Sequence, residues 1–249
     1  MAQVLKETKL IVWDECTMAH KGGVEALSKT LRDIRENGSL MGGVTVLLAG
    51  DFRQNLPVVP RGTRADEVRS CLKSSYLWPQ IKKLALKTNM RVLLGDDATV
   101  GEFAQTVLQI GDGNYPTVDG KIIIPPTLAT VVESLTELTN KIYPDIINLK
   151  AKSIDCYAIK EPDPPKLCNG TRLQITALHH DNHGMLQFPL KVCFAITINK
   201  AQGQTLKMAG IDLMEDCFSH GQFYVACSRV ARISALEYCE AIATGGRSL

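Results

Sequence analysis

A short apolar run that ends in two acidic residues most constrains the fold of this chain. Residues 10–13 read LIVW and are followed directly by Asp14 and Glu15. An uninterrupted apolar run of this length is typical of a buried parallel strand. We expect both carboxylates to stand at the carboxyl end of that strand, which is where open α/β sheets place their sites.

Further strands and helices alternate with this one along the first half of the chain. Residues 44–49 predict a second buried strand, and residues 81–86 predict a third after a helix end at 72–78. Apolar residues at helical spacing predict helices at about 24–36 and 99–110. This alternation predicts an α/β fold built on a doubly wound parallel sheet.

The pattern loosens after Gly111, and we predict a first domain at 1–110, a linker region at 111–126 and a second domain at 127–249. The proline-rich residues 161–165 are expected in a loop, because proline fits neither a helix interior nor a central strand. The second half is predicted to contain helices at 128–141 and 219–228 and strands at 171–178 and 192–198.

Composition sets broad limits on function. Lysine and arginine number 28 against 26 acidic residues, a net charge of +2, which is too small to argue for a nucleic-acid partner. The eight cysteines contain no C-x-x-C pair, which indicates reduced thiols in an intracellular protein. No apolar run approaches the roughly 20 residues that cross a bilayer, so no membrane partner is expected.

The acidic pair suits nucleotide hydrolysis. One carboxylate can hold the Mg²⁺ shell, which is the role expected for Asp14, while Glu15 orients the attacking water. Taken alone, the same pair also fits an ordinary solvated strand end. A second segment, residues 50–54, reads GDFRQ and places the neutral amide of Gln54 just past the neighbouring strand. That amide is a candidate sensor of a terminal phosphate, although a tight turn with Gln54 exposed is the alternative.

Six segments occur in an order that resembles the Pif-type helicases, the petite-integration-frequency group of superfamily-one DNA helicases, which includes versions carried by Helitron transposons. The segments are Asp14-Glu15, 50–58 (GDFRQNLPV), 88–91 (TNMR), 167–173 (LCNGTRL), 194–206 (FAITINKAQGQTL) and 221–230 (GQFYVACSRV).

The resemblance implies a motor that hydrolyses ATP with Mg²⁺ between two RecA-like lobes and moves 5′ to 3′ along single-stranded DNA. It implies that Asp14 and Glu15 are the metal-binding and water-activating acids and that Gln54 is the phosphate sensor. Arg91 and Arg229 would be cationic clamps, because a guanidinium can hold two phosphate oxygens at once.

The segment at 197–205 resembles the motif that couples nucleotide to DNA. Thr197, Asn199 and Lys200 would lie near the DNA backbone, and Gln202 and Gly203 would face the nucleotide. The implied partners are single-stranded DNA and DNA duplex junctions. The implied setting is the nucleus, in DNA repair, recombination, telomere maintenance or transposition, while the oligomeric state stays open.

One feature of the family is absent, because no Gly-x-x-x-x-Gly-Lys-[Ser/Thr] loop occurs in the 249 residues. The chain is therefore expected to be a truncated family member whose first RecA-like lobe lacks the phosphate-loop strand and helix. Two further functions stay open, a catalytically inactive nucleic-acid-binding remnant and a structural interaction module. His179, His180 and His183 are expected in a solvated loop rather than a metal site.

Overall fold

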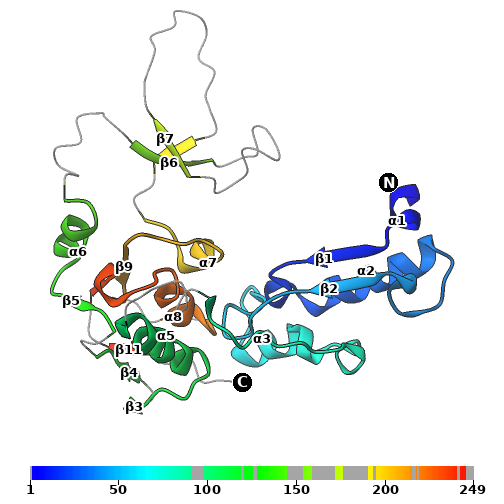
Figure 1. Cartoon of the computed structure of the whole chain (residues 1–249), viewed down its shortest axis with the longest axis horizontal. Helices are drawn as coiled ribbons and strands as arrows, with labels where there is room; N and C mark the ends of the chain where they lie inside the picture. Colours follow the sequence, from blue (N-terminus) through cyan, green and yellow to red (C-terminus); the bar gives the residue numbers. More distant parts are fainter. Residues whose placement is uncertain are drawn as a thin grey trace, which may run out of the picture.

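Two lobes, seen in Figure 1 as an arm and a larger body, form most of the described chain. The computed structural model describes residues 2–90, 98–118, 121–125, 128–144, 154–158, 172–175, 190–192, 195–214, 217, 219–239 and 242–244. Short 3₁₀ turns occur at Cys16–Met18, Leu40–Gly43, Leu72–Ser74, Trp78–Gln80 and Ile233–Ala235.

The arm is built on two parallel strands, β1 (Leu10–Trp13) and β2 (Thr45–Leu48), which pair from Leu10–Thr45 to Trp13–Leu48. Between them the chain forms α2 (Lys21–Ile34), and a short helix, α1 (Ala2–Glu7), precedes β1. Because side chains alternate across a strand, one face of the sheet turns toward α2. The inward residues pack on a buried cluster formed by Cys16, Val24, Leu31, Met41, Leu72 and Leu77. This packing confirms both predicted strands and the predicted first helix.

The outer face of the same sheet is exposed to solvent, contrary to the prediction that both strands are buried. Both strands were predicted to be buried, yet Leu10, Val12 and Leu47 are 55%, 60% and 50% exposed. Within the described residues, α2 covers only one face of the pair, so the alternate side chains meet solvent. The strand predicted at 81–86 is also wrong, because residues 82–89 are irregular and Leu84 is 82% exposed.

The helix α3 (Arg64–Ser70) was missed, and the predicted helix end at 72–78 consists of 3₁₀ turns. Thr63 and Asp66 form a capping box at the start of α3, in which each side chain binds the backbone N–H of the other residue. This reciprocal bonding satisfies two of the orphan donors of the first turn. The spacing Thr63-x-x-Asp66 was the sequence signal for this helix.

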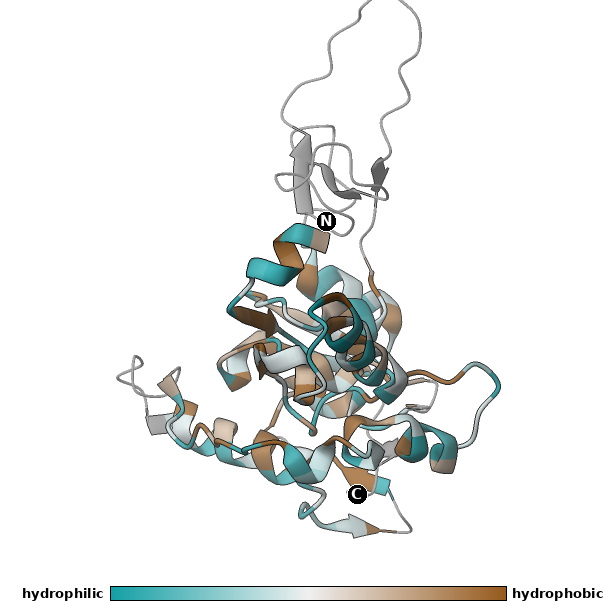
Figure 2. Cartoon of the chain, turned by 90° about the vertical axis from the view of Figure 1, so that its right-hand side faces the viewer, coloured by the Kyte–Doolittle hydropathy of each residue, from teal (hydrophilic) through white to brown (hydrophobic). Residues whose placement is uncertain are grey.

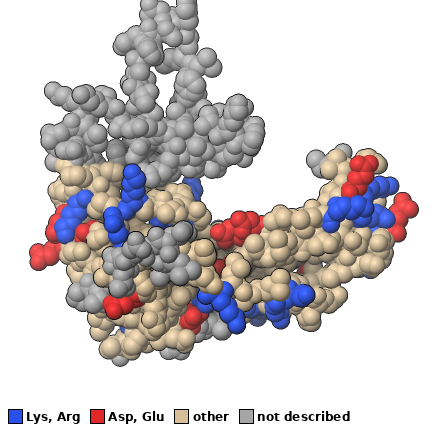
Figure 3. Space-filling view, viewed as in Figure 1, with Lys and Arg blue, Asp and Glu red and all other residues tan. Residues whose placement is uncertain are grey.

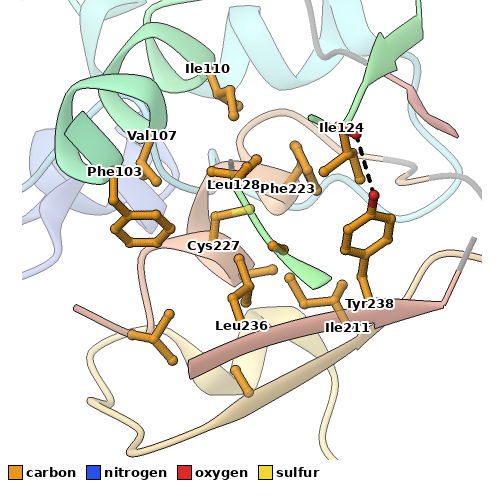
Figure 4. Packing of buried hydrophobic residues seen from close by; sticks show 14 of the residues in the cluster. Phe103, Val107, Ile110, Ile124, Leu128, Ile211, Phe223, Cys227, Leu236 and Tyr238 are labelled. Carbon is orange, nitrogen blue, oxygen red and sulfur yellow. Dashed lines mark hydrogen bonds between the residues drawn. The ribbon is translucent and has the colours of Figure 1, made fainter. Parts of the chain in front are cut away.

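The body is built on a second parallel sheet with strand order β5 (Thr130–Val132), β10 (Leu236–Cys239) and β9 (Ala209–Asp212). Its helices are α5 (Ala98–Gly111), α6 (Leu135–Ile142), α7 (Ile198–Ala201) and α8 (Gln222–Cys227). Figure 4 shows side chains of α5, α8 and the sheet converging in one core. Tyr238 is 1% exposed there and donates its hydroxyl hydrogen to Ile124 O at 3.3 Å. The helices predicted at 99–110 and 219–228 are confirmed.

Two antiparallel sheets accompany the body. One has the order β11 (Ile242–Thr244), β4 (Lys121–Ile123), β3 (Thr117–Val118), and the other has the order β7 (Arg172–Ile175), β6 (Ile154–Ala158), β8 (Leu190–Val192). The region predicted as a linker, 111–126, contains β3 and β4. The division into two domains at that point stays a prediction.

Three predictions in the second half have mixed outcomes. The strand at 171–178 is confirmed as β7. The strand at 192–198 is wrong in position, because β8 ends at Val192 and α7 begins at Ile198. The helix predicted at 128–141 begins only at Leu135, because β5 takes its first part. The loop at 161–165 and the cluster of His179, His180 and His183 lie outside the described residues.

The helices in Figure 2 carry both teal and brown residues, and none of those drawn in colour is brown throughout. Among the residues that the structure describes, no helix is both long enough and apolar enough to span a bilayer.

Candidate functional site

The two acids leave β1 in a turn that is tied to the end of β2. Ala49 N donates to Trp13 O, and Cys16 N donates to Ala49 O, both at 2.9 Å. Glu15 has φ 50°, a left-handed conformation that is uncommon for residues with a side chain. Its backbone N–H donates to Asp14 Oδ1 at 2.9 Å. Asp14 is therefore exposed at the strand end while Glu15 is half-buried.

The turn after β2 packs directly against this acidic turn. A methyl group on Gly50 would lie 2.9 Å from Thr17 Cγ2, so only a glycine permits this close approach. Asp51 shapes the next residues, because its Oδ1 accepts from Arg53 N and its carbonyl from Gln54 N, both at 3.0 Å. Gln54 is thus held in the turn that follows β2, and the role predicted for its amide stays a prediction.

A single amide from the body joins these two turns. Gln202 Nε2 donates to Glu15 Oε2 at 2.9 Å, and Gln202 Oε1 accepts from Asn55 Nδ2 at 3.1 Å. Gln202 follows α7, 187 residues beyond Glu15. The structure therefore brings one predicted catalytic acid and one predicted nucleotide-facing residue into direct contact. Acidic side chains gather where the arm meets the body in Figure 3.

Gln54 and its neighbour Asn55 share one feature, a buried side-chain oxygen without a hydrogen-bond partner among the described residues. A buried acceptor without a donor costs about 1–3 kcal/mol, so such an atom is rare in folded proteins. The backbone carbonyl of Gln54 faces Gly221, where an added methyl group would come within 2.5 Å.

Arg229 braces the segment that carries Gln202. It is 7% exposed, and its guanidinium donates to Ala201 O at 3.1 Å, to Gln204 O at 3.0 Å and to Val225 O at 2.8 Å. Its Nη2 also donates to Ser228 Oγ at 2.8 Å. A fixed fork of five donors suits this cluster of oxygens, because each N–H can point at a separate acceptor.

The remaining predicted residues lie around the same segment. Thr197 and Lys200 are exposed, and Asn199 Oδ1 accepts from Gln222 Nε2 of α8 at 3.1 Å. Gly203 has φ +76°, and nothing lies within 4 Å of the position of a Cβ atom there. Its backbone is therefore open to close approach by a ligand. Arg91 lies outside the described residues.

A second set of contacts holds the arm to the body and was not predicted. Tyr224 OH donates to Asp51 Oδ2 at 3.0 Å, and Arg53 Nε donates to Asp112 Oδ1 at 2.6 Å. Burial raises the pKa of Tyr224, and the Asp51 carboxylate raises it further, so the phenol keeps its proton. Ser219 Oγ also donates to Glu67 Oε1 at 3.2 Å.

Asn55 is the other residue that sequence reasoning missed. Its sequence signal is its place in the segment 50–58, between Gln54 and the buried Leu56. Near the acids, burial raises the pKa of the Cys16 thiol, and the carboxylates of Glu15 and Asp14 raise it further, against a lowering by a backbone hydrogen bond. Cys16 is therefore a neutral packing residue rather than a thiolate ligand.

The donor set suits Mg²⁺, which prefers carboxylate oxygens completed by phosphate oxygens and water. Asp14 and Glu15 offer such oxygens side by side. In the part of the chain that the structure describes, no group of three or more His, Cys, Asp or Glu side chains could hold a metal by itself. An ion here would thus rely on one or two carboxylates together with its substrate.

A parallel α/β sheet with acids at the end of one strand, facing an amide from a second lobe, agrees with the RecA-like class that the sequence predicted. Comparison with known proteins agrees with this class. Residues 1–121 match the family model described as PIF1-like helicase. This part of the chain is therefore similar to the Pif1-type helicases, as its motifs predicted.

Individual relatives carry the same name. The chain is 31% identical over 104 residues to the "ATP-dependent DNA helicase Pif1" of Psychrobacter sp., which is 42% of this chain and 15% of that protein. It is 23% identical to the "ATP-dependent DNA helicase PIF1" of Danio rerio over 92% of this chain and 46% of that protein. The chain thus spans less than half the length of these curated relatives.

Solved structures share the fold. The Pif1 helicase from Bacteroides in complex with ADP-AlF3 and ssDNA aligns with a TM-score of 0.66 at 16% identity. The alignment covers 95% of this chain and 72% of that chain. The RecA-like α/β fold predicted from the sequence is therefore confirmed.

Proposed function

We propose that this chain acts as all or part of an ATP-dependent DNA helicase, coupling Mg-ATP hydrolysis to 5′-to-3′ movement on single-stranded DNA. The 2.9 Å contact between Glu15 and Gln202 carries the proposal. It joins an acid at a strand end to an amide on the segment that would also meet DNA. The names of the relatives, which are ATP-dependent DNA helicases, support the same function.

Asp14 and Glu15 are proposed to have different roles at the end of β1. Bound Mg²⁺ would neutralise charge on the β- and γ-phosphate oxygens. Asp14 is the residue proposed to hold it, because its carboxylate is exposed at the end of β1. Glu15 is proposed to orient the attacking water through the carboxylate oxygen that does not accept from Gln202. The hydrogen bond from Gln202 keeps that carboxylate in one orientation.

Gln54 is proposed to detect the terminal phosphate. Its buried, unpartnered oxygen can accept a hydrogen bond from the attacking water. Its backbone touches Gly221, at the start of α8. A shift of Gln54 when the phosphate leaves would therefore push on α8 and on the body of the protein.

The arginines and the segment 197–205 complete the proposed cycle. Arg229 braces the turn beside Gly203 through backbone carbonyls, and we propose that phosphate oxygens replace some of these acceptors when ATP binds. Arg91 stays a predicted second clamp. Thr197, Asn199 and Lys200 are proposed to face the DNA backbone, where the ammonium of Lys200 would neutralise a phosphate.

The partners and setting follow from this function. We propose single-stranded DNA and duplex junctions as partners and the nucleus as the compartment. Repair, recombination, telomere maintenance or transposition stay predictions from the resemblance. A nucleic-acid-binding protein without ATP turnover is the second candidate.

DNA-stimulated ATP hydrolysis by the purified chain separates these candidates. We expect Glu15→Gln to lower phosphate release at least about 100-fold, because it removes the group that handles the proton. The control Glu36→Gln makes the same chemical change at an exposed position after α2 and should keep full activity.

Each alternative outcome is decisive when single-stranded DNA binding is measured at a stated salt concentration. A wild-type rate no higher than that of Glu15→Gln, with DNA still retarded on a gel, would establish the binding protein instead. Folded protein that fails to retard DNA at low salt would contradict both functions.

A further inference from the structure

Asn55 has an arrangement that stability alone does not explain. Its side chain is 1% exposed, and its Oδ1 is buried without a hydrogen-bond partner in the described part of the chain. An unsatisfied buried acceptor costs about 1–3 kcal/mol, and an apolar side chain would avoid that cost. The compensating contact is the hydrogen bond from Asn55 Nδ2 to Gln202 Oε1 at 3.1 Å.

That bond fixes which end of the Gln202 amide faces the acid. A primary amide has an acceptor oxygen and a donor nitrogen, so a donor on one side turns the nitrogen toward the other side. Asn55 supplies the donor, and Gln202 Nε2 then meets Glu15 Oε2 at 2.9 Å. With the amide reversed, Gln202 Oε1 would face the Glu15 carboxylate, and two acceptors would repel each other.

The backbone of Gln202 is already fixed, so the side chain is the part left to orient. Arg229 holds the carbonyls of Ala201 and Gln204 on either side of it. Rotation about the Cγ–Cδ bond would exchange the positions of Gln202 Oε1 and Nε2. The hydrogen bond from Asn55 selects one of these two orientations. We propose that Asn55 is a positioning residue that sets the Gln202 amide and, through it, the Glu15 carboxylate.

The inference rests on the proposed hydrolytic function for its effect on rate, but its structural half can be tested without activity. In ¹⁵N-labelled protein, the Gln202 side-chain amide gives proton resonances that Gln202→Ala identifies by their loss. We expect these protons to exchange slowly with solvent in the wild type. Asn55→Leu, which keeps the branched skeleton but replaces the amide by two methyl groups and so removes the donor, should accelerate this exchange at least about tenfold.

Asn55→Asp is the sharper variant, because it replaces the donor by an acceptor and turns the Gln202 nitrogen away from Glu15. We expect kcat for DNA-stimulated phosphate release to fall about tenfold in Asn55→Leu, the effect of one hydrogen bond of about 1.4 kcal/mol. It should fall further in Asn55→Asp. The KM for ATP should stay within twofold.

The outcomes distinguish this inference from the proposed function. Unchanged exchange at Gln202 in Asn55→Leu would overturn the inference whether or not the chain hydrolyses ATP. If the wild type is active, faster exchange in Asn55→Leu together with an unchanged kcat of that variant would also overturn the inference. If the wild type shows no ATP hydrolysis, faster exchange in Asn55→Leu would still support the positioning of Gln202, and only the hydrolytic function would be contradicted. Asn114→Asp, at an exposed position after α5, controls for the added charge.

Discussion

The contact between α8 and the Gln54 turn gives the sharpest test of how the two lobes meet. Gly221 has φ +76°, and a methyl group added there would lie 2.4 Å from Arg53 O and 2.5 Å from Gln54 O. These are backbone atoms, so no side-chain rotation relieves the clash. We predict that Gly221→Ala separates α8 from the turn that carries the proposed phosphate sensor.

The size of the effect follows from two terms. An alanine at positive φ costs about 1–2 kcal/mol, because its Cβ crowds the following carbonyl oxygen. Overpacking a tight contact adds about 1–3 kcal/mol. Gly203 has the same φ of +76° with nothing within 4 Å, so Gly203→Ala carries only the first term. Gly221→Ala should therefore be less stable than Gly203→Ala by about 1–3 kcal/mol.

Urea unfolding, followed by far-ultraviolet circular dichroism, measures this difference for both variants against the wild type. For a chain of this size, each 1 kcal/mol also shifts Tm by about 2–4 °C, so Gly221→Ala should melt roughly 2–12 °C below Gly203→Ala. Equal losses of stability in the two variants would refute the close approach of α8 to the Gln54 turn. The positive φ would then account for the whole cost.

Three other substitutions test separate contacts. Arg229→Lys should lower the free energy of unfolding by about 2–3 kcal/mol, because a lysine cannot satisfy the clustered carbonyls. The control Arg232→Lys, at an exposed position, should change the free energy of unfolding little. Urea unfolding measures both variants. Tyr224→Phe should cost about 0.5–1.5 kcal/mol by removing the donor to Asp51, with Tm as the measurement. Hydrogen bonds from Thr63 and Arg69 lower the pKa of Asp66. A lowered carboxyl pKa stabilises the fold above about pH 4 and loses that effect as pH falls, so the Tm difference between wild type and Asp66→Asn should shrink in acid. A pH-independent difference would contradict this assignment.

The local parts of the site were predictable from the sequence because they depend on neighbouring residues. The run LIVW before Asp14 predicted β1 and placed the acids at its end, as the structure has them. The strand predicted at 81–86 was wrong because strand formation also depends on residues far away in the chain. Apolar content alone does not make a strand, because the ladder needs a partner, and the described structure pairs no strand with that segment.

The sequence by itself determined which chemical groups are available, because strand ends, turns and motif order follow from residues close together in the chain. Only the tertiary structure decided that Gln202 donates to Glu15 and accepts from Asn55. Hydrogen bonds form over about 3 Å, and a pair 187 residues apart reaches that distance only when both lobes have packed. The same packing seats Gly221 against the Gln54 turn and gives Asn55 its orienting role.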